Sequence, residues 1–149
     1  DREGANDPTK LQRHLLCYEL ASGKKLWEQV VPSKVEEDPW QGFLTEHGYA
    51  THTPVADGER VYVFFGKTGA LAFDHDGKQL WHTPLGTDSG RNRWGSGASP
   101  ILFGDLLIVN AADESRALVA LDKKTGQQVW KADGDAIGMA YGTPSVITT

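Results

Sequence analysis

The 149-residue sequence has few of the residues that cross-link a protein or anchor it in a membrane. It holds a single cysteine, Cys17, which excludes an internal disulfide. No run approaches the ~18 apolar residues of a membrane helix, so no span is expected within this stretch. Lysine and arginine number 15 against 20 acidic residues, and no more than two basic residues are adjacent. The net charge of −5 and the lack of a basic stripe argue against a nucleic-acid partner.

An internal repeat dominates the rest of the sequence. One pattern occurs three times and ends at Trp27, Trp81 and Trp130. It begins with a hydrophobic residue and Asp or Glu, continues through a turn to Gly, and closes with two residues, a hydrophobic residue and Trp. A second signature, a hydroxyl residue before proline, keeps the same register at Thr53-Pro54, Ser99-Pro100 and Thr143-Pro144. The tryptophans are 54 and 49 residues apart, and the prolines 46 and 44. Repeats of this length, built from short β-rich pieces, predict a radial or linear array.

Each repeat reads as four short strands. In the second repeat the first three predicted strands are Thr53–Ala56, Val61–Phe65 and Ala70–Phe73. The fourth strand contains Trp81, and turns with Gly, Asp or Asn-type residues separate the strands. The unit is therefore an antiparallel meander that is apolar on both faces, and it needs a neighbour on each side. The fold class predicted is all-β, a β-propeller fragment of four-stranded antiparallel meander blades.

The repeat also predicts the organisation of the chain. We expect a polar N-terminal segment (residues 1–13) and a propeller fragment (14–149), which divides into a partial blade (14–31), two complete blades (48–83 and 94–131) and a partial blade (139–149). Propellers close with about 4–8 blades, so this chain is expected to be a piece of a longer protein. Its two uncovered sheet faces predict that the chain alone associates or aggregates in solution.

The three repeat tryptophans are expected to pack between blades rather than to bind a ligand. Trp27, Trp81 and Trp130 occupy the same place in each repeat. A buried tryptophan removes ~150–250 Å² from water, which suits a wedge between neighbouring sheets. We interpret them as structural docking residues.

The repeat resembles that of the pyrroloquinoline-quinone-like (PQQ-like) β-propeller family. In both, a hydroxyl-Pro pair comes first. It is followed by Ala or Cys, a hydrophobic residue, Asp or Glu, a turn with Gly, two further residues, a hydrophobic residue and Trp. That family includes quinoprotein alcohol dehydrogenases and the propeller lipoprotein of bacterial outer-membrane protein assembly. The resemblance covers residues 14–149 and implies a periplasmic or extracytoplasmic location. Tryptophan–aspartate repeats would place Asp after the Trp, where Glu28, His82 and Lys131 stand. Kelch repeats would need a Gly-Gly pair, which the sequence lacks.

Candidate binding residues lie in the links between blades, residues 31–49, 84–95 and 132–142. In a four-stranded meander these links share one face with the loops between second and third strands, here called the loop face. Loops on a rigid scaffold are where binding residues concentrate. The candidate ligand- or partner-binding residues are Trp40, His47, Tyr49, Arg91, Arg93, Trp94 and Tyr141.

Arg91, Arg93 and Trp94 form the most suggestive group. Two guanidinium groups and an indole beside a glycine can hold a carboxylate, a phosphate or a peptide backbone. The alternative is a solvated loop in which Trp94 caps the first strand of its blade.

Other suggestive residues have simpler interpretations. His47 and His52 are five residues apart in an irregular segment, so no metal site is predicted. Asp74–Gly77 resembles the start of a calcium loop, but no downstream acidic ligand follows, and it is read as a turn. Cys17 aligns with alanines in the other repeats and is read as a small buried residue. Asp113–Arg116 is read as a solvated loop tip.

Two functions remain open. The preferred hypothesis is a non-catalytic repeat module, without cofactor or catalytic residues, that acts as a scaffold or binding platform. Its partners would be the remaining blades of the same propeller and an unknown protein or small molecule. The alternative is part of a PQQ-dependent quinoprotein dehydrogenase. The resemblance implies that such an enzyme holds the quinone with a Trp platform and Ca²⁺, beside a vicinal cysteine pair and a catalytic Asp, and none of these can be placed in the sequence.

Overall fold

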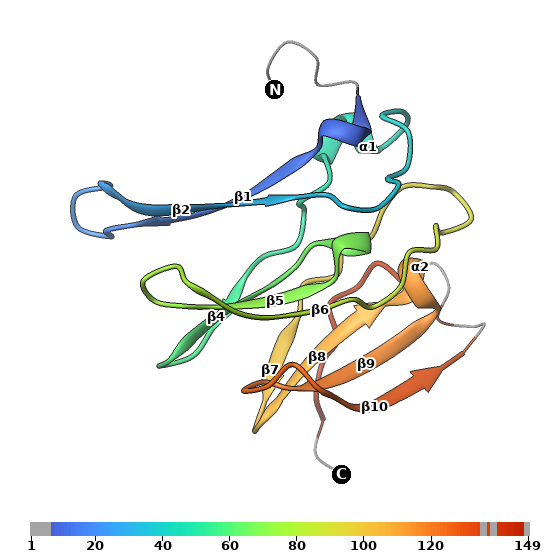
Figure 1. The fold of residues 1–149 in the computed structure, drawn as a ribbon. Helices are drawn as coiled ribbons and strands as arrows, with labels where there is room; N and C mark the ends of the chain where they lie inside the picture. Colours follow the sequence, from blue (N-terminus) through green and yellow to red (C-terminus); the bar gives the residue numbers. More distant parts are fainter. Residues whose placement is uncertain (1–6, 135–136, 138–139, 148–149) are drawn as a thin grey trace.

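The chain folds into three antiparallel sheets that stack one after another in sequence order (Figure 1). The computed structural model describes residues 7–134, 137 and 140–147. Residues 1–6 of the predicted polar N-terminal segment lie outside the described residues, as do residues 139, 148 and 149 of the predicted last partial blade. None of the helices in the described part is long and apolar enough to cross a membrane.

The strands follow the predicted meander. The first sheet pairs β1 (Gln12–Tyr18) with β2 (Lys25–Pro32). The second sheet runs in the order β3 (Val55–Ala56), β4 (Arg60–Phe64), β5 (Ala70–Asp74) and β6 (Gln79–Thr83). The third sheet runs in the order β7 (Ile101–Phe103), β8 (Leu106–Ala111), β9 (Ala117–Asp122) and β10 (Gln128–Asp133). The all-β class and the two four-stranded antiparallel sheets are thereby confirmed.

Four short helical turns occur among the described residues, and all but the first lie between strands. They are the 3₁₀ turns η1 (Pro8–Lys10) and η2 (Gly66–Thr68), and the one-turn helices α1 (Leu44–His47) and α2 (Ala112–Ser115). The turns η2 and α2 occupy equivalent places, since each links the second strand of a four-stranded sheet to the third. Both therefore lie on the loop face.

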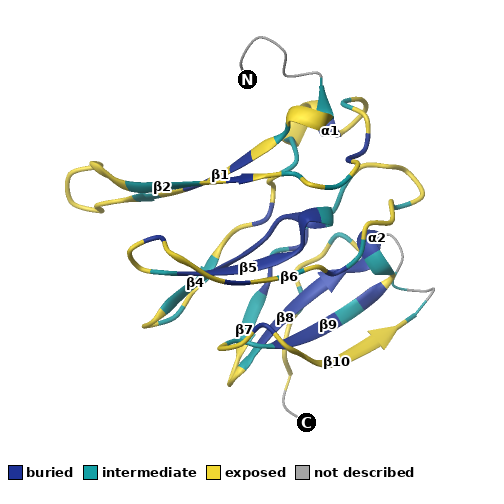
Figure 2. Ribbon diagram, viewed as in Figure 1, coloured by how far each residue is buried: buried dark blue, intermediate teal, exposed yellow. Residues whose placement is uncertain are grey.

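The second sheet is buried on both faces, which explains its unbroken apolar strands (Figure 2). Along β4, Val63 belongs to the core shared with the first sheet, whereas Tyr62 and Phe64 belong to the core shared with the third. On β5, Leu71 and Ala72 alternate in the same way. The middle sheet therefore contributes to both apolar cores and joins the three sheets into one body.

A tryptophan of one repeat contacts the turn glycine of the next, and this contact occurs twice. The indole N–H of Trp27 donates to the carbonyl of His75 at 2.7 Å, and that of Trp81 donates to Lys123 at 3.1 Å. A Cβ added at Gly77 would lie 2.9 Å from the Trp27 ring, and one at Gly126 would lie 2.7 Å from the Trp81 ring. The repeat glycine thus provides both a left-handed turn and the space for the neighbouring indole.

The hydroxyl-Pro signature forms a second link between repeats. The backbone N–H of Thr53 donates to Ser99 Oγ at 2.9 Å, and the N–H of Ser99 donates to Thr143 Oγ1 at 3.2 Å. The hydroxyls of Ser99 and Thr143 therefore each accept a hydrogen bond from the preceding repeat. Because this residue precedes proline, its backbone is held extended, which aims the N–H at the next repeat.

Residues 140–147 follow the third sheet without forming a strand. They are held against it by the side-chain amide of Asn110, which donates to the carbonyls of Ala140 and Gly142 at 2.9 and 3.1 Å. Asn110 is buried near the end of β8, and these two bonds satisfy its side-chain amide.

The Trp–Gly contact predicts unequal costs for two matched glycine substitutions. Gly23 and Gly126 have nearly the same φ, +70° and +73°, but a Cβ at Gly23 meets nothing within 4 Å. We expect Gly23→Ala to cost about 1 kcal/mol through backbone strain alone. Gly126→Ala should cost roughly 1–3 kcal/mol more, because the Trp81 ring must move. Urea denaturation measures both, and equal losses would contradict the packing role.

Candidate functional site

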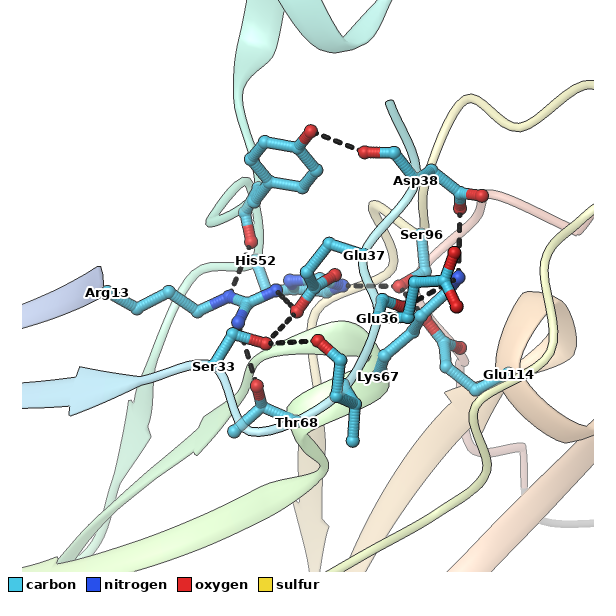
Figure 3. Close-up of polar contacts among 12 residues, drawn as sticks. Arg13, Ser33, Glu36, Glu37, Asp38, His52, Lys67, Thr68, Ser96 and Glu114 are labelled. Carbon is cyan, nitrogen blue, oxygen red and sulfur yellow. Dashed lines mark hydrogen bonds and ion pairs between the residues drawn. The ribbon is translucent and has the colours of Figure 1, made fainter. Parts of the chain in front are cut away.

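A group of buried polar side chains lies on the loop face, where the three sheets meet (Figure 3). We call it the buried polar cluster, and its members are Arg13, Glu37, Asp38, His52, Lys67, Thr68, Ser96, Asp113 and Glu114. They come from β1, from the links 33–54 and 84–96, and from the turns η2 and α2. The cluster therefore connects parts of the chain that are up to about a hundred residues apart in sequence.

Arg13 makes three hydrogen bonds inside the cluster. Its Nη2 forms an ion pair with Glu37 Oε1 at 2.8 Å, its Nη1 donates to Thr68 Oγ1 at 2.7 Å, and its Nε donates to the Tyr49 carbonyl at 3.0 Å. Ser33 also donates to Glu37 Oε1, at 2.7 Å. The guanidinium is 2% exposed, so these bonds replace its water shell and hold the first link against the second sheet.

Lys67 joins the first and second links. Its ammonium lies 3.4 Å from Asp38 Oδ2 and donates to Ser89 Oγ at 2.9 Å, and Ser89 donates in turn to Asp38 Oδ1 at 2.7 Å. Lys67 also reaches the carbonyl of Glu36 at 3.4 Å. Residues 36–38 and residue 89 are thereby fixed to the turn η2 and to each other.

His52, Ser96 and Glu114 form a third set of contacts. His52 Nε2 and Ser96 Oγ are 3.1 Å apart, and the Ser96 hydroxyl donates to Glu114 Oε1. Three buried atoms of the cluster have no hydrogen-bond partner among the described residues: His52 Nδ1, Glu114 Oε2 and Asp113 Oδ2. In a hydrolytic triad the acid bonds the second histidine nitrogen, but here it bonds the serine, so the arrangement is not that of a serine hydrolase.

Burial changes the pKa of these groups. It lowers the pKa of His52 to about 4, with smaller contributions from the charges of Arg13 and His47. It raises the pKa of Glu114 to about 7, against the hydrogen bond from Ser96. Burial also raises the pKa of Asp113, assisted by the negative charge of Asp38. At neutral pH His52 is therefore uncharged, and Glu114 holds a proton more readily than an exposed glutamate does.

The interpretation of Asp113–Arg116 as a solvated tip is wrong. Asp113 and Glu114 are 5% and 3% exposed, because the link 84–96 wraps over α2. The N–H of Asp88 donates to the Glu114 carbonyl at 3.0 Å. A Cβ at Gly86 would lie 2.1 Å from that carbonyl, and one at Gly90 would lie 2.4 Å from the Asp113 carboxylate. Two glycines in the link allow this close approach, which the acidic composition of the turn did not suggest.

Two spaces adjoin the cluster. A small cavity of about 30 Å³ is lined by Arg13, His52, Lys67 and Glu114 among others, and holds no more than a small molecule such as water. An open cleft of about 1550 Å³ lies between residues 33–40 of the first link and residues 87–93 of the second. Lys67 borders both spaces, so the cleft lies directly next to the buried polar cluster.

The structure places the predicted site residues in different surroundings. Trp40 and Arg93 line the cleft, and Tyr49 lines the cavity. Arg91 is exposed and borders neither space, and His47 is exposed at the end of α1, where its Nδ1 lies 3.0 Å from Thr51 Oγ1.

Aromatic rings form two groups on the loop face. Trp94 packs edge-on against Phe43 with ring centroids 4.6 Å apart, and it also faces Tyr141 at 5.9 Å. Trp40 faces Tyr49 at 5.5 Å. Phe43 and Trp94 remain 51% and 37% exposed, so an apolar pair faces solvent on this face.

Most of the buried polar cluster was missed by the sequence interpretation. Arg13 lies in the predicted polar segment 1–13, and Glu37 and Asp38 lie in an acidic run that reads as solvated. One signal was present: Asp113-Glu114 stands at the position of Lys67-Thr68 in the preceding repeat, so opposite charges occupy equivalent turns of adjacent repeats. Such a pair of turns on one face predicts a charge contact between them.

The residues present do not fit the quinone and calcium site that the dehydrogenase resemblance implies. Within residues 7–134, 137 and 140–147, no group of three or more His, Cys, Asp or Glu side chains could hold a metal ion. Cys17 is the only cysteine, it is half-buried, and it lies on β1 outside the cluster. No step through such a cofactor can be built on these side chains.

Comparison with known proteins places the fold. The model of a protein family described as outer membrane protein assembly factor BamB matches residues 9–142. The crystal structure of BamB from Moraxella catarrhalis is similar to 90% of this chain, with a TM-score of 0.62 at 18% identity. A europium-containing methanol dehydrogenase and the quinohemoprotein alcohol dehydrogenase from Comamonas testosteroni are each similar to 80% of it, both with a TM-score of 0.54, at 15% and 17% identity.

These matches cover only part of the known structures. The chain spans 34% of the BamB chain and 21% and 18% of the two dehydrogenases. A search of curated proteins gave no match.

Glu114 gives the cluster a predictable pH dependence. Its pKa rises from 4.5 to about 7 on folding, so the folded state holds the proton more tightly, and stability is lost as the pH rises through this window. Relative to Glu114→Gln, the wild type should lose up to about 3 kcal/mol of unfolding free energy between pH 4.5 and 8. Urea titrations of both proteins across this range measure the difference. Parallel pH profiles would contradict a buried, protonated Glu114.

Proposed function

Since the chain belongs to the family of the outer membrane protein assembly factor BamB, we propose that it is a non-catalytic module that binds a protein partner during outer membrane protein assembly. We further propose that it does so in the periplasm and that the partner contacts the loop face. The buried polar cluster is then the support of the binding surface rather than a reactive centre.

The open cleft is the observation that carries this proposal. Its volume of about 1550 Å³ lies above the range of roughly 300–1,000 Å³ that is usual for small-molecule pockets. It is bounded by two extended links rather than enclosed by strands. A groove of this kind suits a segment of polypeptide better than a small ligand.

The charges along the cleft favour a polar polypeptide. Lys34 and Arg93 stand on its walls beside Glu36 and Asp88, and all four residues are exposed. Walls that carry both signs of charge complement a segment with both donors and acceptors, whereas a single anion would favour one sign. The chain's net charge of −5 is consistent with this, since it does not single out an anionic partner.

Aromatic side chains provide apolar anchors near the same cleft. Trp40 lines it, and Trp94 follows Arg93 directly in the chain while packing against the exposed Phe43. Tryptophan and arginine are over-represented among the residues that dominate binding energy at protein interfaces. The predicted residues Trp40, Arg93 and Trp94 are therefore the ones on which we base the interface.

The buried polar cluster keeps the two walls at a fixed separation. The contacts among Lys67, Asp38 and Ser89 connect the first wall to the second, and Arg13 holds the first wall to the sheet below. A surface that is already ordered loses less entropy on binding. This supports a binding role for loops that would otherwise be mobile.

The proposal predicts which tryptophans matter for binding. We would measure binding of the full chain to peptides that tile the periplasmic segments of outer membrane proteins and of their assembly machinery. Trp94→Ala and Trp40→Ala should each lower the affinity for the captured peptides by about 2 kcal/mol, or roughly 30-fold, as substitutions of central interface residues do.

Leu80→Ala is the matched control, because Leu80 is 41% exposed on β6 at the outer side of the second sheet. It should leave peptide affinity unchanged. Equal affinity for all three variants, or an equal loss with Leu80→Ala, would count against the loop face as the binding surface. Circular dichroism of each variant separates lost binding from lost folding.

A further inference from the structure

We propose that the small cavity inside the buried polar cluster binds one small hydrogen-bond donor, a water molecule or an ammonium ion, through His52, Asp113 and Glu114. This binding goes beyond the proposed capture of a protein partner and does not depend on it. The ligand joins the link 33–54, which carries His52, to the turn α2, which carries both carboxyl groups.

Three polar atoms that need a hydrogen-bond partner belong to residues that line this cavity. They are His52 Nδ1, Asp113 Oδ2 and Glu114 Oε2, and each lacks a partner in the described part of the chain. The three residues are only 7%, 5% and 3% exposed. An unpaired polar atom at such depth costs free energy, so a ligand that bonds all three at once is strongly favoured.

The contacts of Ser96 determine which of these atoms accept a hydrogen bond (Figure 3). The Ser96 hydroxyl has a single proton, which it donates to Glu114 Oε1. In the 3.1 Å contact between His52 Nε2 and Ser96 Oγ, the donor is therefore the imidazole N–H. Because His52 is uncharged at neutral pH, its Nδ1 carries a lone pair and accepts. An ionised Asp113 accepts as well.

Glu114 decides which of the two donors fits. When Glu114 is protonated, its Oε2 can donate to a water molecule, which donates its own two protons to His52 Nδ1 and Asp113 Oδ2. When Glu114 is ionised, all three atoms are acceptors, and an ammonium ion satisfies them with three of its four N–H groups. Burial raises the pKa of Glu114 to about 7, so both forms occur in the neutral range. Ammonium binding then releases the Glu114 proton to solvent.

The size and the charge of the cavity limit the ligand to these two. Its volume of about 30 Å³ exceeds the roughly 10–15 Å³ that one water molecule needs, and a larger molecule does not fit. Besides Glu114, the charged or titratable groups that line it are Asp113 on α2, Lys67 on η2, Arg13 on β1, Glu37, Asp38, Tyr49 and His52 on the link 33–54, and Asp88 on the link 84–96. Acidic side chains therefore outnumber basic ones, which favours a cation.

A metal ion fits less well than ammonium. Among the residues that the structure describes, no group of three or more His, Cys, Asp or Glu side chains could hold one. Hard cations also prefer oxygen ligands to an imidazole nitrogen, whereas an N–H group bonds either. The cavity adjoins the open cleft, because Glu37, Asp38, Lys67 and Asp88 line both spaces. Three of these four are acidic, so a cation in the cleft is drawn towards the cavity.

A crystal structure of the 149-residue chain tests the site itself. Crystals grown at pH 5.5 without ammonium salts should show one ordered solvent peak within about 3.2 Å of His52 Nδ1 and of Asp113 Oδ2 or Glu114 Oε2. Glu114→Gln should keep this peak, because its amide N–H donates as the protonated carboxyl group does. A well-ordered cavity without such a peak would overturn the proposal.

Thermal unfolding at pH 8 separates the two donors, with ammonium chloride compared to sodium chloride at equal ionic strength. If ammonium is the ligand, each tenfold increase above its dissociation constant should raise the Tm by about 3–6 °C in ammonium chloride alone. At pH 5.5 its affinity should be roughly 30-fold weaker, because little Glu114 is ionised there. Equal Tm values in the two salts, together with the solvent peak, assign the ligand as water.

Two variants locate the ammonium response. Glu114→Gln should abolish it, because the amide N–H opposes an N–H of the ion. Glu36→Gln is the matched control, since Glu36 is exposed and lines the cleft but not the cavity, and it should respond as the wild type does. A response that persists in Glu114→Gln, or that both variants lose equally, would place the ion elsewhere and overturn ammonium as the ligand of this cavity.

Discussion

The contact of an indole with the turn glycine of the following repeat is the interaction on which the rest of the structure depends. A four-stranded meander with apolar side chains on both faces is unstable in water unless another sheet covers each face. The rings of Trp27 and Trp81 contact the next sheet directly, in the space that Gly77 and Gly126 leave. Only then do the two apolar cores close, and only then do the links between sheets reach the same face.

The buried polar cluster shows what this arrangement makes possible. Arg13 and Glu114 are separated by a hundred residues, and they meet only because three sheets converge on the loop face. Partial burial makes each member dependent on its partners, since an unpaired charge there is costly. The arrangement of the sheets does not determine the function, because similar structures occur in an assembly factor and in two dehydrogenases. The difference must lie in the links, and here they carry mixed charges and aromatic rings.

Much of the fold could be predicted from sequence because it is specified by local patterns repeated in register. Val61–Phe65 and Ala117–Leu121 are read as strands by composition alone, and the spacing of the tryptophans gives the sheet count. The candidate site could not be predicted to the same extent. Glu37 and Glu114 become buried through contacts with residues far away in sequence, and a carboxylate beside other acidic residues carries no local sign of burial. Only the charge reversal between Lys67 and Asp113-Glu114 in equivalent turns hinted at the cluster.

The ladder from Thr53 to Ser99 to Thr143 has a consequence for how such a chain can change in length. Each rung joins one repeat to the next, across 46 residues from Thr53 to Ser99 and 44 residues from Ser99 to Thr143, and the proline directly follows the hydroxyl residue in every copy. Duplicating or deleting one whole unit would regenerate the same junctions on either side, whereas a partial insertion would shift the donors away from their acceptors. Exchange of whole units would therefore preserve the junction chemistry, which exchange of partial units would not.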